Sequence, residues 1–292
     1  MTETLTLKAG RWSAEVAPAI GGALLSLSYK GEPILRPTPA EAIEAGDVRL
    51  TAGYPMIPYA NRIDHGRFSF GGGDHRLQPS DIALPHSLHG VGWRRAWTVE
   101  AATTKACTLR LVHHPDADWP FAFSAVQQFV LSDQRLTLRM SVTNLEDAPA
   151  PAGLGWHPFF RRRPGEALTF SAKGAWANGP DLLPSAIETD ASWNYGRGRA
   201  LDQRGVDNDF FGWGGLARLA APAGPVVVLR ASRAFGGLRL YTPPGQDFYA
   251  VEPVTHLANA INRPELKAHA MTLLAPGASL RGDIEIEIGD AV

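Results

Sequence analysis

The sequence contains a single cysteine, Cys107, and has no run of about 18 apolar residues. One cysteine excludes an internal disulfide, and scarce cysteine is typical of proteins in the reducing cytoplasm. The lack of a long apolar run excludes a membrane-spanning helix, and the N-terminal residues lack the basic and apolar regions of a signal peptide. We therefore expect a cytoplasmic protein without a membrane partner, in which Cys107 is an inert, packed thiol.

The sequence has no surplus of charge of either sign. Its 28 Lys and Arg residues against 29 Asp and Glu residues give a formal net charge of −1. Nucleic-acid-binding proteins usually carry a strong basic surplus, so we expect no nucleic-acid partner. The short basic run Arg161–Arg163 predicts a solvated loop, with a bound sugar phosphate as the alternative. Walker, Rossmann and nucleophile-elbow motifs are also absent, and we therefore expect no cofactor.

Uninterrupted helical segments are scarce as well, because 30 Gly and 23 Pro residues punctuate the chain. Apolar and polar residues alternate instead, most clearly at Leu136–Val142 and at Ile284–Ile288. Alternation with period two is typical of a strand that has one face on a core and the other in water. One short helix is expected at Ala40–Ala45, begun by Pro39. We predict an all-β fold, a large antiparallel β-sandwich that forms a single domain over residues 1–292.

Several polar segments are expected to be loops rather than sites. Arg161–Gly165 and Ser185–Gly205 predict surface excursions of the sandwich. His113–Asp118 has the composition of a turn and lacks the fixed spacing of a metal site, so it predicts a solvated loop. Asp207–Asp209 places carboxylates on a loop before an aromatic strand, but without the spacing of an EF-hand. We expect no metal site.

Two histidines stand in unusual surroundings. His89 precedes Gly90, and His157 lies between a tryptophan and the run Pro158-Phe159-Phe160. Imidazole exchanges a proton near neutral pH, and a glycine lets a ligand approach the backbone closely. Trp93 and Trp97, which follow His89, suit the apolar face of a sugar ring. The alternative is structural: His89 would cap a turn, and His157 would be a core histidine bonded to backbone.

Three other polar positions complete the candidate set. Asn61 and Arg62 combine an amide with a guanidinium fork, which can hold a carboxylate, a phosphate or a pair of hydroxyls. Glu252 ends an apolar, aromatic strand, where a carboxylate is costly to bury unless it is paired. We therefore expect Glu252 to be a functional base. A loop asparagine with a surface arginine, and a solvent-facing glutamate, are the alternatives.

The order of these residues resembles the aldose 1-epimerase (galactose mutarotase) family. The resemblance runs from about Ala60 to Asn262, and its most specific parts are Ala60–Ile63, Gly66–Phe68 and Leu88–Gly90. It implies a galactose-mutarotase-like β-supersandwich, a free monosaccharide as substrate, and a monomer or homodimer. It also implies that Glu252 is the general base on the anomeric hydroxyl and His157 the general acid at the ring oxygen. The residues implied to bind sugar hydroxyls or stabilise charge are Asn61, Arg62, His89 and Asp207.

The reaction of this family needs two proton transfers and no cofactor or metal. Opening a pyranose removes a proton from the C1 hydroxyl and delivers one to the ring oxygen, and closure after rotation about C1–C2 reverses both. We expect Glu252 and His157 to converge on opposite edges of one sugar. The chain departs from the family pattern at Trp156, where the galactose enzymes have Asn, and at Pro253-Val254, where they have Thr-Gln. A substrate-contacting Gln upstream of the Glu has no clear counterpart, so this chain resembles a divergent bacterial branch.

Three alternatives remain open at this point. A hexose-phosphate mutarotase would use Arg62 and Arg161–Arg163 to grip phosphate. A non-catalytic sugar-binding or sugar-sensing protein would keep the fold without the reaction. A glycosidase would need two carboxylates that flank the bond, a requirement that Glu252 and Asp207 could meet.

Overall fold

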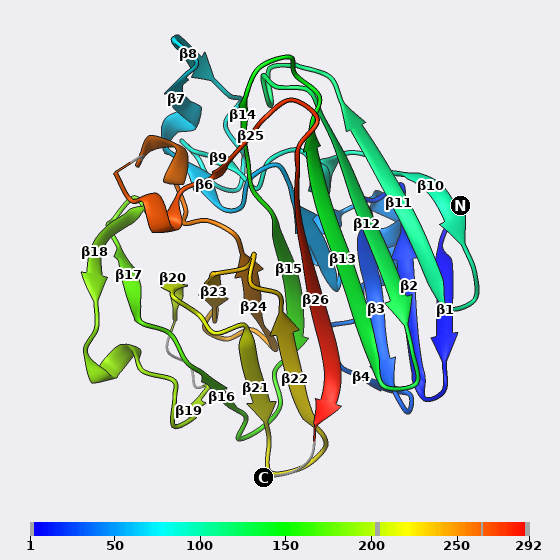
Figure 1. Cartoon of the computed structure of the whole chain (residues 1–292). Helices are drawn as coiled ribbons and strands as arrows, with labels where there is room; N and C mark the ends of the chain where they lie inside the picture. The colour runs from blue at the N-terminus through cyan, green and yellow to red at the C-terminus, as the bar shows by residue number, and fades with distance from the viewer. Residues whose placement is uncertain (1–2, 202–204, 264, 290–292) are drawn as a thin grey trace.

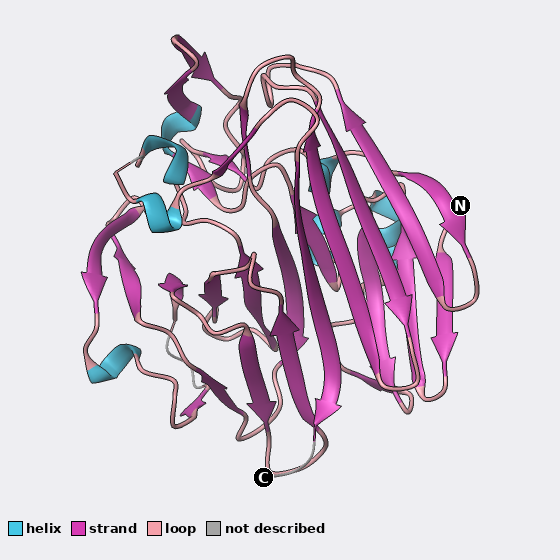
Figure 2. Ribbon diagram, viewed as in Figure 1, coloured by secondary structure: helices cyan, strands magenta, loops and turns pink. Residues whose placement is uncertain are grey.

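The computed structural model describes residues 3–201, 205–263 and 265–289. Nearly all of its regular structure is antiparallel strand, and the strands form two large sheets and three small ones (Figure 1, Figure 2). The predicted all-β class is therefore confirmed. In these three ranges no helix is long and apolar enough to cross a membrane.

The first large sheet has eleven strands and carries the candidate site. In spatial order it contains β1 (Leu5–Ala9), β2 (Trp12–Ala17), β3 (Ala23–Tyr29), β5 (Gly53–Met56), β15 (Gly155–Arg161), β24 (Phe248–Val254), β23 (Gly237–Tyr241), β20 (Asp207–Phe211), β17 (Gly174–Asn178) and β18 (Pro184–Glu188), with β4 (Glu32–Pro33) paired to β3.

The second large sheet has nine strands. In spatial order these are β10 (Thr98–Ala102), β11 (Ala106–His113), β12 (Phe123–Leu131), β13 (Arg135–Asn144), β26 (Ser279–Gly289), β22 (Val226–Ala231), β21 (Leu216–Ala220), β16 (Ala167–Phe170) and β19 (Arg199–Ala200). β26, red in Figure 1, lies between β13 and β22 and so joins early and late parts of the chain.

The remaining strands are paired in twos: β6 (Arg62–Ile63) with β9 (Ser87–Leu88), β7 (Arg67–Phe70) with β8 (Gly73–Arg76), and β14 (Ala150–Ala152) with β25 (Thr272–Leu274). The predicted helix is present as α1 (Ala40–Ala45), with Pro39 as its N-cap and Gly46 in the left-handed conformation at its end. The other helices of the described chain are short 3-10 turns, at Val48–Leu50, Asp64–Gly66, Gly92–Arg94, Ala191–Trp193, Ala260–Asn262 and Lys267–His269.

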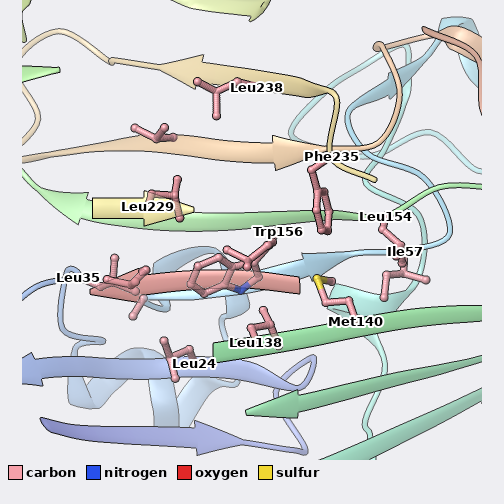
Figure 3. Close-up of a cluster of buried hydrophobic side chains, with 14 of the residues drawn as sticks. Leu24, Leu35, Ile57, Leu138, Met140, Leu154, Trp156, Leu229, Phe235 and Leu238 are labelled. Carbon is pink, nitrogen blue, oxygen red and sulfur yellow. The ribbon is translucent and has the colours of Figure 1, made fainter. Parts of the chain in front are cut away.

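The core lies between the inner faces of the two large sheets, and the alternating segments contribute to it as predicted. From the second sheet, Leu138 and Met140 of β13 and Ile286 of β26 are buried, while the polar residues between them face out. Trp156 and Leu24 approach from the first sheet (Figure 3). Cys107 is buried in β11, as expected of a packed thiol, and burial raises its pKa to about 11.

Three segments that were expected to be loops contain strand residues. Asp207 and Asp209 lie on strand β20 itself rather than on a loop before it. His113 is the last residue of β11 and is buried, with its Nε2 atom 2.9 Å from the carbonyl oxygen of Trp119. The stretch Ser185–Gly205 includes most of β18 and all of β19, and its residues 202–204 lie outside the described chain. Polar residues at strand ends were mistaken for turns because their pairing partners are distant in sequence.

We predict that Leu138→Ala lowers the free energy of unfolding by about 2–5 kcal/mol, because it opens a cavity in a core that has little room to collapse. Leu145→Ala is the matched control, since this leucine is 48% exposed. It should change the free energy of unfolding by less than about 0.5 kcal/mol. Equilibrium urea unfolding measures both. Equal losses in the two variants would contradict the assignment of the core.

Candidate active site

The pairing register of the first sheet sets one row of polar side chains across its outer face. On β15 and β24, Gly155 pairs with Val254 and Phe159 with Ala250, which places His157 opposite Glu252. On the other side of β24, Glu252 pairs with Arg239 of β23. Residues directly opposite in an antiparallel pair project from the same face. With the neighbouring pairs, the row therefore reads Tyr54, His157, Glu252, Arg239 and Asp209.

A cleft of about 520 Å³ lies over this row. It is lined by all six residues that the sequence and the resemblance single out: Asn61, Arg62, His89, His157, Asp207 and Glu252. They come from strands β15, β20 and β24 and from the segments around β6 and β9. The fold thus brings together residues that are far apart in the sequence, while their individual roles stay predictions.

Glu252 and His157 touch at the floor of the cleft. Oε1 of Glu252 lies 3.2 Å from Nε2 of His157, and the two side chains are 2% and 8% exposed. Oε2 of Glu252 and Nδ1 of His157 are buried without a hydrogen-bond partner among the described residues. We expected the two groups on opposite edges of a sugar, and that expectation is wrong. They lie side by side because they occupy facing positions on adjacent strands.

Burial disfavours a charge on either member of this pair. It raises the pKa of Glu252 well above its ordinary value, and the guanidinium of Arg239 offsets part of that shift. Burial, together with a smaller contribution from the positive charge of Arg36, lowers the pKa of His157 to about 3. The favoured state is therefore a neutral carboxyl beside a neutral imidazole. Because the two groups are in contact, they titrate as one pair that shares a proton.

Arg239 is the residue of this site that the sequence analysis missed. It is 1% exposed, and its Nε and Nη2 atoms donate to Oδ1 of Asp207 at 3.0 and 2.6 Å. Its Nη1 atom donates to Oδ1 of Asp209 at 3.0 Å. Burial alone would lower the pKa of Arg239, but the two carboxylates outweigh burial and raise it. Arg239 therefore carries a fixed charge that holds Asp207 in place at the rim of the row.

His89 and Asn61 fix each other through two reciprocal hydrogen bonds. The backbone N–H of Asn61 donates to Nδ1 of His89 at 3.0 Å, and the N–H of His89 donates to the carbonyl of Asn61 at 3.0 Å. Because Nδ1 accepts, the ring proton of His89 is on Nε2, where it can serve a ligand. Burial lowers the pKa of His89, so the ring is neutral. The side-chain Oδ1 of Asn61 in turn accepts from the backbone N–H of Arg62 at 2.8 Å.

Gly90 serves the protein rather than a ligand. It has φ +68°, and a Cβ atom there would lie 2.3 Å from the carbonyl oxygen of Ile57. We expected this glycine to let a ligand approach the backbone. Instead, it lets the backbone of Ile57 pass close to its own backbone.

The aromatic walls of the cleft differ from those expected. Tyr54, Phe159, Tyr241 and Phe248 line it, whereas Trp93 and Trp97 do not. Trp93 stacks on Tyr54 with the ring centroids 5.4 Å apart, and its Nε1 atom donates to the carbonyl of Gly90. Trp97 belongs to the main core.

The basic run Arg161–Arg163 does not line the cleft. Arg162 donates to backbone carbonyls, including those of Leu201 at 2.6 Å and Gln246 at 3.0 Å. Arg163 is paired with the buried Glu166 through contacts of 2.6 and 2.9 Å. These two residues neither belong to a solvated loop nor form a phosphate-binding site, because their N–H groups already donate to other parts of the protein. Arg161 is exposed at the end of β15.

Comparison with known proteins identifies the family. A sequence profile described as aldose 1-epimerase matches residues 3–287. The chain belongs to the aldose 1-epimerase family. A relative from Escherichia coli K12, the uncharacterized protein YphB, is 26% identical over 302 residues, covering 97% of this chain and 98% of the relative. A second E. coli relative, the uncharacterized protein YihR, is 25% identical over 158 residues, which cover 54% of this chain and 50% of the relative.

Solved structures show the same fold. A putative aldose 1-epimerase from E. coli K12 superposes with a TM-score of 0.89 at 26% identity, covering 98% of this chain and 99% of that one. A galactose mutarotase-like protein from Clostridium acetobutylicum gives a TM-score of 0.85 at 19% identity, with 98% and 95% covered. The aldose epimerase homologue from C. elegans gives 0.84 at 16%, with 99% of each chain covered. The predicted galactose-mutarotase-like supersandwich is therefore confirmed.

The departures from the family pattern fall mainly behind the cleft. Trp156 alternates with His157 and is buried in the core between the sheets (Figure 3). Pro253 alternates with Glu252 and is likewise buried, on the side away from the row. The substitutions at Trp156 and Pro253 therefore alter packing rather than the ligand-facing surface. Val254 shares the face of Glu252, but it is buried and does not line the cleft. Gln246, which the sequence comparison did not single out, lines the cleft.

One cluster outside the cleft has metal-ligand types. Asp64, His65 and His86 have their ligand atoms within 4.8 Å of one another. Nδ1 of His86, however, already accepts the backbone N–H of His65 at 3.0 Å. Its lone pair is therefore committed, and the cluster fits a hydrogen-bonded turn better than a metal centre.

We predict that Arg239→Met lowers the free energy of unfolding by about 3–5 kcal/mol, because it leaves the buried carboxylate of Asp209 and the partly exposed carboxylate of Asp207 without their partner. Arg230→Met is the matched control. Arg230 pairs with Glu287 at 2.7 Å, but its side chain is 46% exposed, so its loss should cost less than about 1 kcal/mol. Chemical unfolding of both variants tests this, and a loss for Arg239→Met no larger than for Arg230→Met would contradict it.

Proposed function

We propose that the protein is an aldose 1-epimerase that interconverts the α and β anomers of a free aldose by general acid–base ring opening and closure. The observation that carries the proposal is the contact between Glu252 and His157, at the floor of a cleft that is large enough for a monosaccharide. On the grounds of its sequence, we further propose that it acts in the cytoplasm.

The closeness of the two groups fits the chemistry of the ring. The C1 hydroxyl and the ring oxygen are both bonded to C1, so the two proton transfers occur at neighbouring oxygens on one edge of the sugar. Glu252 would take the proton of the C1 hydroxyl while His157 delivers a proton to the ring oxygen. Rotation about C1–C2 then turns the aldehyde, and closure returns both protons. Each positioned acid or base contributes roughly 10²–10⁴ to such a rate.

The proton count of the pair supports both roles. Moving one proton across the 3.2 Å from Oε1 of Glu252 to Nε2 of His157 converts the neutral pair into a carboxylate and an imidazolium. The second form contains a base and an acid with the same total number of protons. The pair thus needs no proton from solvent to become competent, and ring closure restores it.

The other lining residues supply the hydroxyl contacts. Nε2–H of His89 and the amide of Asn61 offer donors, and Asp207 offers a carboxylate oriented by Arg239. Arg62 lies 3.9 Å from Asp207 and can stabilise negative charge that develops on an oxygen. A glycosidase would need Asp207 as a second free carboxylate, but its Oδ1 atom accepts two donors from Arg239. A non-catalytic sugar-binding protein would have no use for a buried acid–base pair.

We predict that Glu252→Gln lowers kcat by at least about 10²-fold, because the amide keeps the shape and loses the basicity. Sugar affinity should stay within about tenfold, or ~1.4 kcal/mol. His157→Ala should lose a similar factor in kcat. Polarimetry on freshly dissolved single anomers, with the spontaneous rate subtracted, measures turnover, and titration calorimetry measures binding. Turnover near that of the wild type in Glu252→Gln would refute the base assignment.

We also predict an unusual pH profile, because the competent pair holds one shared proton. Acid adds a second proton only as the pH approaches the lowered pKa of His157, about 3. Alkali removes the shared proton only above the raised pKa of Glu252. On the acid side, the value of kcat/KM should therefore stay level as the pH is lowered to 5, with circular dichroism showing that the fold persists. A drop centred near 6.5, the ordinary pKa of histidine, would contradict this.

A further inference from the structure

Arg36 differs from the other arginines of the cleft in having no anionic partner. Four arginines line the cavity: Arg36, Arg49, Arg62 and Arg239. Arg49 pairs with Asp47 at 2.6 Å, Arg62 lies 3.9 Å from Asp207, and Arg239 is held by two aspartates. Within the described residues, no carboxylate lies within 4.0 Å of Arg36. The exposed Asp247 acts on it only from beyond contact distance.

The guanidinium of Arg36 is nevertheless held rigidly. Its Nη2 atom donates to the carbonyls of Arg49 at 2.9 Å and Thr51 at 2.8 Å. Its Cζ atom lies 4.0 Å from the ring centroid of Phe159 and 4.4 Å from that of Phe248. Nε is buried without a hydrogen-bond partner, and Nη1 makes no hydrogen bond to the rest of the described chain. The protein thus fixes the group and leaves two of its nitrogen atoms unused.

Arg36 is partly buried, and withdrawing a cation from water without a counter-ion is costly. Burial lowers the pKa of Arg36, because it disfavours the charged form of the guanidinium. Contacts with the faces of two aromatic rings recover part of that cost, but they supply no negative charge. In a ligand cleft, the missing counter-ion can come from the ligand.

We propose that Arg36 binds an acidic substituent of the sugar, a carboxylate or a phosphate, so that the enzyme acts on acidic aldoses. This inference rests on the proposed function. It names a residue different from Arg62 and Arg161–Arg163, from which the sequence suggested a phosphate grip. An arginine fork forms short, charge-assisted hydrogen bonds to either anion.

The position of Arg36 fits a substituent on C5, the carbon that is bonded to the ring oxygen on the side away from C1. Its guanidinium stacks on Phe159, which is two residues from His157 on the same face of β15. Two residues along a strand span about 7 Å. Its other aromatic neighbour, Phe248, shares the face of Glu252 and lies four residues away, about 14 Å along β24. A hexose with its C1 at Glu252 and His157 would therefore direct a C6 group toward Arg36.

The test compares anomerisation of D-glucose, D-glucuronate and D-glucose 6-phosphate by exchange NMR. We expect the wild type to have a kcat/KM at least about tenfold higher on one acidic sugar than on glucose. Which acidic sugar is preferred distinguishes a carboxylate from a phosphate substituent. Arg36→Gln should lower the ratio of kcat/KM on that sugar to kcat/KM on glucose by about tenfold, mainly through KM, over and above any loss common to all three sugars that comes from the effect of Arg36 on His157. Arg36→Lys should keep part of the preference, because it keeps the charge.

Arg139→Gln is the matched control. Arg139 is exposed on the second sheet, where it donates to Gln128, so its replacement removes one positive charge far from the cleft. This variant should retain the preference for the acidic sugar. A wild type without such a preference would overturn the proposal. Equal losses by Arg36→Gln on all three sugars would also overturn it, since Arg36 would then only clamp the segment that contains Arg49 and Thr51.

A binding measurement separates this inference from the proposed function. If the wild type accelerates none of the three sugars, the mutarotase proposal fails, and calorimetric titration of the same sugars then tests Arg36 by itself. Binding of an acidic sugar that weakens about tenfold in Arg36→Gln, and not in Arg139→Gln, supports the inference. Equal binding by both variants overturns it.

Discussion

The site depends on the antiparallel register among β15, β24 and β23. This register sets His157, Glu252 and Arg239 side by side, and it turns Trp156 and Pro253 to the opposite face. Because side chains alternate with a period of two, a slip of one residue would turn Glu252 into the core and bring an apolar residue to the cleft. The same strand alignment therefore decides which side chains enter the core and which line the cleft.

Burial then decides the protonation of the groups that the register assembles. Arg239 keeps its charge because Asp207 and Asp209 flank it. Among the described residues, Glu252 and His157 form an ion-pair contact only with each other, so burial favours their neutral forms. One small surface thus contains fixed charges that orient a ligand and a neutral pair that can exchange a proton. The groups differ in charge because Arg239 has two carboxylates beside it, whereas Glu252 and His157 have no such fixed counter-charges in contact within the described chain.

Local sequence patterns predicted the strands well and the contacts between them poorly. Alternation at Leu136–Val142 identified β13 and its buried face, because that signal lies within one segment. Arg239, between Leu238 and Leu240, has the same local pattern as a solvent-facing strand residue. Its role appears only when β20 is placed beside it. The resemblance to a family supplied Glu252 and His157, but not their direct contact, which depends on pairing between distant segments.

The place of β26 in the second sheet has a consequence for folding. β13 and β22 have their shared neighbour in residues 279–289, so the strands on either side have an open edge until that segment docks. An unpaired edge beside apolar residues is prone to associate with other chains. Pairings so remote in sequence also slow the search for the native topology. The facing edges of β13 and β22 therefore stay unpaired until residues 279–289 have been synthesised and have docked between them.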